Sequence, residues 1–200
     1  MSEEMSAMQS AATLQASTGQ GAQRLFFALW PDAPTRQRLV AAVAALRARH
    51  ATAGRWLDPA GYHLTLHFLG DFAPLAPALV AQVCAAAQAV DAPAFALRLD
   101  QAGSFASRDH PWWLGCGAPP PALFELWRQL DSALDRAGVP RESCRDFVPH
   151  LTVLRRARLA LPVTELEPLV WPVDAFVLVA SAAGSSARDC RLLRRFALRT

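Results

Sequence analysis

The sequence contains no lysine, so all 20 of its basic residues are arginines. Against 17 acids they leave a net charge of only +3, and ten of them lie from Arg141 onward, where six acids accompany them. A guanidinium group can hold a phosphate through two parallel hydrogen bonds. The arginines therefore favour a phosphate-bearing partner slightly, although any single one is more often a solvated surface charge.

Paired cysteines and long apolar runs are also missing. Residues 1–22 lack the basic and apolar regions of a secretory signal, so we expect a disordered tail there, in a cytoplasmic protein with reduced thiols. Pro, Arg, Asp or Gly interrupts every apolar run before 18 residues, so no membrane-spanning helix is expected. The cysteines stand far apart without a Cys-x-x-Cys pair, at Cys84, Cys116, Cys144 and Cys190.

The rest of the chain fits one domain, residues 23–200, which we expect to be a monomer. Of the 200 residues, 52% are hydrophobic, enough for one substantial core but not for two domains of usual size. Strand-like and helix-like stretches are interleaved. The pattern predicts helices over 34–50, 75–90 and 121–138, and strands over 24–30, 61–70, 94–100, 111–117, 147–155, 171–181 and 191–198.

A four-residue phrase occurs once in each half of the domain. The first copy, His63-Leu64-Thr65-Leu66, and the second, 150–153 (HLTV), lie 87 positions apart. A sequence with only five histidines places two of them at the start of these phrases. Both copies fall in predicted strands, which indicates a weak internal duplication within a single domain.

Strand alternation predicts which side chains of each phrase share a face. His63, Thr65 and His67 are expected on one face of their strand, opposite the apolar Leu64, Leu66 and Phe68. In the same way His150 and Thr152 share a face opposite Leu151 and Val153. If the two halves face each other about a pseudo-twofold axis, the two polar stripes meet in a groove.

Two imidazoles and two hydroxyls in one groove suit acid–base catalysis. Histidine titrates near neutral pH, so one member of a pair can accept a proton while the other donates one. The hydroxyls of Thr65 and Thr152 can donate hydrogen bonds to a charged oxygen in the transition state. A lone His-x-Thr is more often structural, but recurrence in matching strands favours a catalytic site.

Other chemistries find less support in the sequence. The spacing of His63 and His67 would bring two zinc ligands together on a helix but separates them on a strand, and no Glu follows His63 to make His-Glu-x-x-His. No serine lies in a Gly-x-Ser-x-Gly turn, and no cysteine stands beside either phrase. We therefore expect neither a metal site nor a covalent intermediate.

The repeated phrase resembles the two His-x-Thr-x motifs that define the two-histidine (2H) phosphoesterase superfamily. More narrowly, five segments in order resemble the bacterial RNA 2',3'-cyclic phosphodiesterases, also called 2'-5' RNA ligases. The likeness runs from about Arg24 to Leu198. The segments are RLFFALWPD, RWLDPAGYHLTLHFLGD, GSFASRDHPWWLG, DFVPHLTVLRRA and VLVASAAGSSARDCRLLRRFAL.

This resemblance implies a bilobal α+β fold, with two antiparallel sheets, flanking helices and an active-site cleft between the lobes. It implies hydrolysis of 2',3'-cyclic phosphates at RNA ends to 2'-phosphates, without metal or other cofactor. His63 would protonate the leaving 3'-oxygen and His150 would activate water. Ligation is a further activity that this likeness allows, as the reverse of hydrolysing a 2'-5' linkage.

Three positions depart from the family pattern or fit it incompletely. Cys190 stands where the family often has tyrosine, and His67 fills a variable position, so it is more simply a bystander than a site residue. Arg155 matches an arginine common after the second motif and would bind substrate. Strict alternation puts it opposite His150, so it reaches the cleft only if the strand ends or bulges near Leu154.

Two rival functions remain open from the sequence. One keeps the chemistry but acts on a small nucleotide that carries a cyclic phosphate. The other is a non-catalytic RNA-binding module, in which Phe105, Trp112 or Trp113 stacks on bases. Core packing is the simpler expectation for the two tryptophans.

Overall fold

The structure is a computed structural model that describes residues 21–141, 146–182 and 190–200. The predicted tail, residues 1–22, therefore lies outside the described residues except for its last two positions, which have no regular structure. Cys144 and the whole connection between the last two strands, 183–189, also lie outside them.

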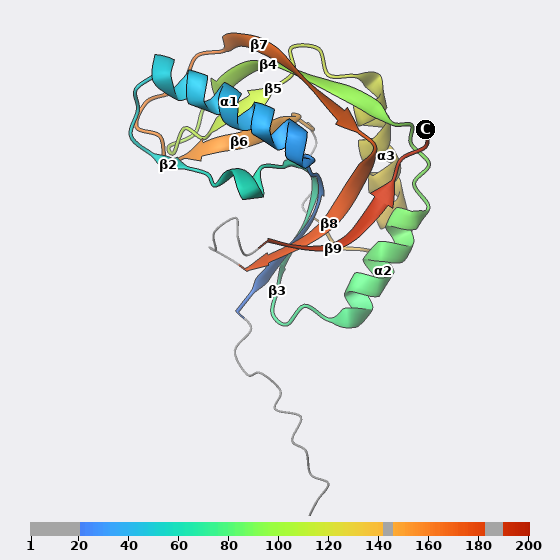
Figure 1. Cartoon of the computed structure of the whole chain (residues 1–200). Coiled ribbons are helices and arrows are strands. Elements are labelled where there is room, and N and C mark those ends of the chain that lie inside the picture. The colour runs from blue at the N-terminus through green and yellow to red at the C-terminus, as the bar shows by residue number, and fades with distance from the viewer. Residues whose placement is uncertain (1–20, 142–145, 183–189) are drawn as a thin grey trace, which may run out of the picture.

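The described residues fold into strands, three α-helices and a short 3₁₀ turn (Figure 1). The helices are α1 (Ala33–Arg49), α2 (Pro77–Gln88) and α3 (Pro121–Arg136), and the 3₁₀ turn is η1 (Pro59–Gly61). The strands are β1 (Gln23–Leu29), β2 (Arg55–Trp56), β3 (Leu64–Phe72), β4 (Phe95–Ser104), β5 (Trp112–Gly115), β6 (His150–Arg155), β7 (Thr164–Val173), β8 (Ala175–Ala182) and β9 (Cys190–Ala197).

The strands pair antiparallel in the order β7-β4-β5-β6-β3-β1-β8-β9, with β2 beside β6. One registered pair, Leu64 with Leu151, joins β3 to β6 and so links the first four strands of this order to the last four. The expectation of two antiparallel sheets is not confirmed, because the inner strands come close enough at this pair to form one hydrogen-bonded network. The antiparallel α+β architecture is confirmed, and the pseudo-twofold axis stays a prediction.

The helices cover the two groups of strands from different sides (Figure 1). Helix α1 contacts β7, whereas α3 contacts β3, and α2 packs between α3 and β9. As the sequence predicts, α1 buries a stripe that includes Leu39, Val43 and Leu46. Asp32 caps the helix by accepting a hydrogen bond from the amide of Thr35 at 2.9 Å.

Most of one long strand, β7, is not predicted by the sequence pattern, since the predicted strand over 171–181 includes only its last three residues. Its residues TELEPLVWPV include Pro168 and Pro172, and proline cannot donate a hydrogen bond within a sheet. Strand β7 lies at the end of the strand order, where one side needs no donor, and its pairing with β4 is irregular between Leu99 and Gln101. An edge position therefore accommodates a segment whose composition argues against a strand.

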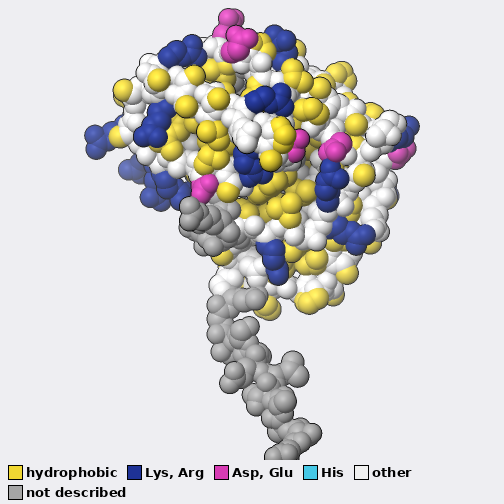
Figure 2. Space-filling view, viewed as in Figure 1, with side chains coloured by type: hydrophobic (Ala, Val, Ile, Leu, Met, Phe, Trp, Pro, Cys, Tyr) yellow, Lys and Arg dark blue, Asp and Glu magenta, His cyan; other side chains and the backbone are white. Residues whose placement is uncertain are grey.

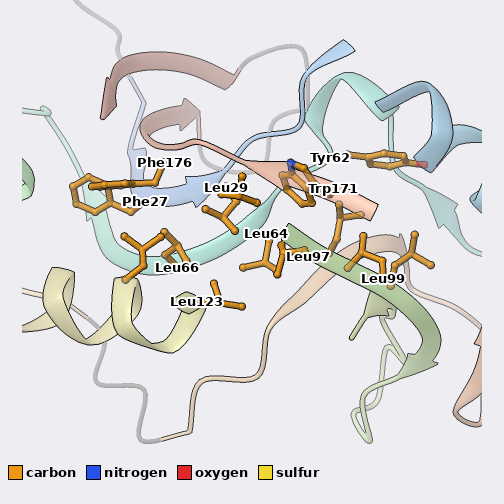
Figure 3. Packing of buried hydrophobic residues seen from close by; sticks show 14 of the residues in the cluster. Phe27, Leu29, Tyr62, Leu64, Leu66, Leu97, Leu99, Leu123, Trp171 and Phe176 are labelled. Carbon is orange, nitrogen blue, oxygen red and sulfur yellow. The ribbon is translucent and has the colours of Figure 1, made fainter. Parts of the chain in front are cut away.

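A single large core holds both groups of strands together. Figure 3 shows Leu64 and Leu66 of β3 pointing toward helix α3, with Leu97 of β4 close to Leu64. Leu64 and Leu151 are fully buried, so the apolar back of each repeated phrase is fixed in this core. Among the described residues, no helix is long and apolar enough to cross a membrane.

Candidate active site

The two repeated phrases meet at the junction between the two groups of strands. His63 immediately precedes β3, and His150 is the first residue of β6. Because Leu64 pairs with Leu151, continuing this antiparallel register by one residue sets each histidine against the threonine of the other phrase. The leucines point into the core, so all four polar side chains lie on the opposite face of the junction.

Both histidines are held in the same way. Nδ1 of His63 donates a hydrogen bond to the carbonyl oxygen of Gly61 at 2.7 Å, and Nδ1 of His150 donates to the carbonyl oxygen of Val148 at 2.8 Å. A carbonyl oxygen only accepts, so Nδ1 carries the proton in each neutral ring. Nε2 is then a base when the ring is neutral and an acid when the ring is protonated.

Aromatic rings surround each imidazole, in different arrangements. His63 stacks on Trp30 with ring centroids 5.5 Å apart and an angle of 5° between the planes, and it also contacts Phe26 at 5.1 Å. His150 meets Phe105 edge-on, with centroids 4.7 Å apart. His63 thus lies against two aromatic rings, one of them stacked, whereas the contact of His150 with Phe105 is edge-on.

The pKa of both histidines lies below its ordinary value. Burial is the largest cause in each case, and the hydrogen bond to the backbone carbonyl opposes it. The positive charge of Arg155 lowers both pKa values further, and His150 also lowers the pKa of His63. The two imidazoles and Arg155 are therefore close enough to interact electrostatically.

A β-bulge follows the threonine in both phrases. In β3, Thr65 pairs with Ala28 and His67 with Phe27, so Leu66 is the extra residue. In β6, Thr152 pairs with Trp113 and Leu154 with Trp112, so the extra residue is 153. The two strands thus share a backbone irregularity at the same position, which strengthens the evidence for an internal duplication.

These bulges change which side chains face the cavity. The bulge that Arg155 requires is present, and Arg155 lines the cavity together with His63 and Thr65. In the other copy the equivalent position is Phe68, which also lines the cavity. The prediction that His67 shares a face with His63 is wrong, because the extra residue turns His67 to the opposite side.

His67 is buried against helix α3 instead. Its Nε2 donates a hydrogen bond to the carbonyl oxygen of Trp127 at 3.0 Å, and its ring stacks on the Trp127 indole. The indole Nε1 in turn donates to the carbonyl oxygen of Leu66 at 3.0 Å. His67 and Trp127 therefore hold the bulged segment of β3 onto the helix, a structural role that agrees with the bystander interpretation.

The cavity has a volume of about 600 Å³ and extends well beyond the histidines. His63, Thr65 and Arg155 line it, whereas His150 and Thr152 are not among its lining residues. Sequence reasoning missed the rest of its wall, including Arg24 and Arg55. Both arginines open segments that carry the family resemblance, but that likeness assigns them no role, so only the fold shows that they line one cavity. The other lining residues are Phe26, Trp56, Leu57, Asp58, Gly61, Phe68, Asp71, Ser181, Ala182 and Cys190.

The three aromatic residues of the RNA-binding hypothesis lie in different places, one in the core and two on the side of the histidines. Trp112 is buried, and its Nε1 donates to the carbonyl oxygen of Leu159 at 2.9 Å, so core packing is confirmed for it. Trp113 is the Cα partner of Thr152 and lies against Gly103, where an added Cβ would come within 2.6 Å of its ring. Phe105 contacts both Trp113 and His150. Of these three aromatic residues, Phe105 and Trp113 thus lie on the side of the histidines.

Two further observations concern metals and cysteines. In the described ranges, no three His, Cys, Asp or Glu side chains cluster closely enough to hold a metal ion. The cysteines that the structure describes form no disulfide, and Cys190 is part of the cavity wall.

Fold and site together define a class, the phosphoesterases with paired His-x-Thr motifs at the junction of an antiparallel α+β fold. The family description "LigT like Phosphoesterase" matches residues 29–113. The chain is 34% identical, over 88% of its length and 97% of the relative's, to a protein of Escherichia coli K12 named RNA 2',3'-cyclic phosphodiesterase. The chain belongs to the LigT-like phosphoesterase family.

Other relatives and solved structures agree with this assignment. A protein of Geobacillus stearothermophilus with the same name is 37% identical over 50% of this chain and 32% of its own length. The crystal structure of E. coli LigT in apo form matches with a TM-score of 0.74 and 33% identity, covering 90% of this chain and 99% of that one. A crystal structure of a Thermus thermophilus protein matches with a TM-score of 0.69 and 26% identity, covering 88% of this chain and 98% of that one.

Proposed function

We propose that this chain hydrolyses the 2',3'-cyclic phosphate at RNA ends to a 2'-phosphate, with His63 as general acid and His150 as general base. The curated relatives that carry the name RNA 2',3'-cyclic phosphodiesterase support this activity. The main support for the roles of the two histidines is that the two phrases lie side by side at the Leu64–Leu151 pair. Nδ1 of each histidine is hydrogen-bonded to a backbone carbonyl, which leaves Nε2 for the reaction.

The reaction adds one water to the cyclic diester. Neutral His150 accepts a proton from water at Nε2 while the water oxygen forms a bond to phosphorus. The bond from phosphorus to the 3'-oxygen breaks, and protonated His63 gives its Nε2 proton to that oxygen. Proton exchange with solvent then restores both rings, so the step needs no cofactor and no metal.

The remaining site residues are assigned to the phosphate. Thr65 and Thr152 would donate hydrogen bonds to the non-bridging oxygens, where negative charge grows in the transition state. Arg155 would neutralise the same group through its guanidinium. Its charge faces both imidazoles and lowers both pKa values, and a bound phosphate would offset this effect.

The product distinguishes this proposal from its alternatives. Adenosine 2',3'-cyclic phosphate should yield the 2'-monophosphate alone in the presence of EDTA, as followed by phosphorus NMR. Formation of the 3'-monophosphate would reverse the assignment of donor and acceptor. Activity that is lost in EDTA and restored by a divalent ion would contradict the metal-independent mechanism, and absence of any turnover would favour the binding module.

A further inference from the structure

Three arginine side chains from three strands converge on the cavity. Arg24 comes from β1, Arg55 from β2 and Arg155 from β6. Arg55 and Arg155 are direct Cα partners in the antiparallel pair of β2 and β6. Like charges directly opposite each other on paired strands are destabilising, so stability of the fold does not account for this pair.

Few acids offset these three charges. Arg24 lies 3.5 Å from Asp71, but about half of each side chain is exposed (42% and 50%), so this ion pair is weak. In the part of the chain that the structure describes, neither Arg55 nor Arg155 forms an ion pair with an acid. Asp58 also lines the cavity, and its carboxylate accepts a hydrogen bond from the amide of Ala60.

Arg155 is close to both other guanidinium groups, whereas Arg24 lies far along its strand from the level of Thr65. Burial lowers the pKa of Arg155, and the charges of Arg55 and Arg24 lower it further. On β1, Arg24 lies four residues from Ala28, the partner of Thr65, which corresponds to roughly 13 Å along the strand. A phosphate bound at Thr65 is therefore not the natural ligand of Arg24.

An apolar surface separates the two polar ends of the cavity. Phe26 and Phe68 are Cα partners on β1 and β3, between the level of Thr65 and that of Arg24, and both line the cavity. Figure 2 shows that basic side chains are spread over one face of the molecule, and the strand register gives the order of groups within the cavity. A ligand that alternates charged and flat apolar groups, as a nucleic acid strand does, fits this order.

We propose that Arg24 and Arg55 form a second phosphate subsite, which binds the phosphate on the 5' side of the terminal ribose. This inference rests on the proposed function and refines its substrate. It implies that the enzyme prefers an oligonucleotide with a cyclic end to a nucleoside cyclic phosphate. The same chemistry would accept a 5'-monophosphate, so the experiment must separate these two sources.

Four substrates test the subsite. They are a nucleoside 2',3'-cyclic phosphate, the same compound with a 5'-phosphate, a dinucleotide ending in a cyclic phosphate, and that dinucleotide with an uncharged methylphosphonate linkage. The wild-type enzyme should have a higher kcat/KM for the charged dinucleotide than for the nucleoside and the uncharged dinucleotide. If a 5'-phosphate suffices, the nucleoside cyclic phosphate with a 5'-phosphate should have the same kcat/KM as the charged dinucleotide. If the internucleotide linkage is needed, its kcat/KM should be lower. Equal values for the charged and uncharged dinucleotides would overturn the proposal.

Arginine variants provide the matched comparison. Arg55→Gln and Arg24→Gln should each lower the kcat/KM ratio of charged to uncharged dinucleotide by about 5- to 20-fold, the range of one hydrogen bond to a charged group in a partly exposed site. Arg49→Gln, the same change at an exposed position of α1, should leave the ratio unchanged. If the subsite variants slow both dinucleotides equally, the arginines serve the cyclic phosphate or the fold instead.

Two readouts do not depend on turnover. The first readout is calorimetric binding of the dinucleotide that ends in a 2'-phosphate, measured at several salt concentrations. The variant that combines Arg24→Gln with Arg55→Gln should reduce the slope of log affinity against log salt by about 0.7 for each lost phosphate contact. Arg55→Gln should leave the melting temperature unchanged or raise it, because it removes a like-charge pair. An unchanged salt slope contradicts the subsite even if the enzyme proves inactive, whereas inactivity on every substrate contradicts the proposed function.

Discussion

The two copies of the His-x-Thr phrase share a backbone but differ in what surrounds it. In both, Nδ1 of the histidine is bound to the carbonyl oxygen two residues before it, and the residue after the threonine forms a bulge. The position five residues after the histidine is Phe68 in one copy and Arg155 in the other. The shared backbone arrangement therefore orients both imidazoles alike, while the flanking residues can give the copies different roles.

The bulges are also stabilised differently. The carbonyl oxygen of Leu66 in the first bulge accepts from the indole Nε1 of Trp127, a side chain of α3. The carbonyl oxygen of Val153 in the second bulge accepts from the backbone amide of Leu57 at 2.9 Å. The first copy thus depends on a replaceable side chain, whereas the second depends on the path of the main chain.

The largest effect is expected from removing either imidazole. His63→Ala and His150→Ala should each lower kcat by about 10²- to 10⁴-fold, the usual contribution of one general acid or base. Steady-state kinetics on adenosine 2',3'-cyclic phosphate measures this loss, with circular dichroism as the control for folding. Near-native turnover in both variants would place the active site elsewhere.

The threonines should matter less, and similarly in both copies. Thr65→Val and Thr152→Val keep the side-chain shape and delete the hydroxyl, so kcat should fall by roughly 10- to 1000-fold, as when one oxyanion donor is removed. Thr→Ser at the same positions should restore most of the rate. A change in melting temperature without a change in kcat would make these residues structural.

Trp127→Phe tests how the first bulge is held. It keeps a ring to stack on His67 but leaves the buried carbonyl of Leu66 without its donor, so unfolding free energy should fall by about 1–3 kcal/mol. Chemical denaturation gives this value. Phe124→Leu, a change at another α3 position with a partly exposed ring, is the control and should cost less.

The smallest effect concerns acid stability. Burial lowers the pKa of His67, so the unfolded chain binds a proton more readily than the folded one. Stability should be complete above pH of about 6.5 and decline as pH falls below it toward the lowered pKa. His67→Gln should make this decline shallower in melting curves between neutral and mildly acidic pH. An unchanged slope would mean that His67 does not contribute to it.

The sequence predicts the strands and the two histidines of the site better than the other residues that line the cavity. Alternation and helical spacing locate the helices and most strands, and the repeat identifies the two histidines. Bulges leave no mark in the alternation of HLTL and HLTV, so alternation assigns His67 to the wrong face. Edge strand β7 is hard to predict because it contains two prolines. Arg24 and Arg55 line the same cavity only because strands that are distant in the sequence converge there.

The pH dependence of kcat/KM tests the paired-histidine account most directly. With His150 neutral and His63 protonated in the active form, the rate should rise and then fall with pH, with apparent pKa values that belong to the pair. Both pKa values are lowered, so the maximum should lie below the ordinary histidine pKa of about 6.5. The residual activity of His150→Ala should lose the rising limb and that of His63→Ala the falling limb. A bell-shaped pH profile that keeps both limbs in either variant would contradict the paired-histidine mechanism.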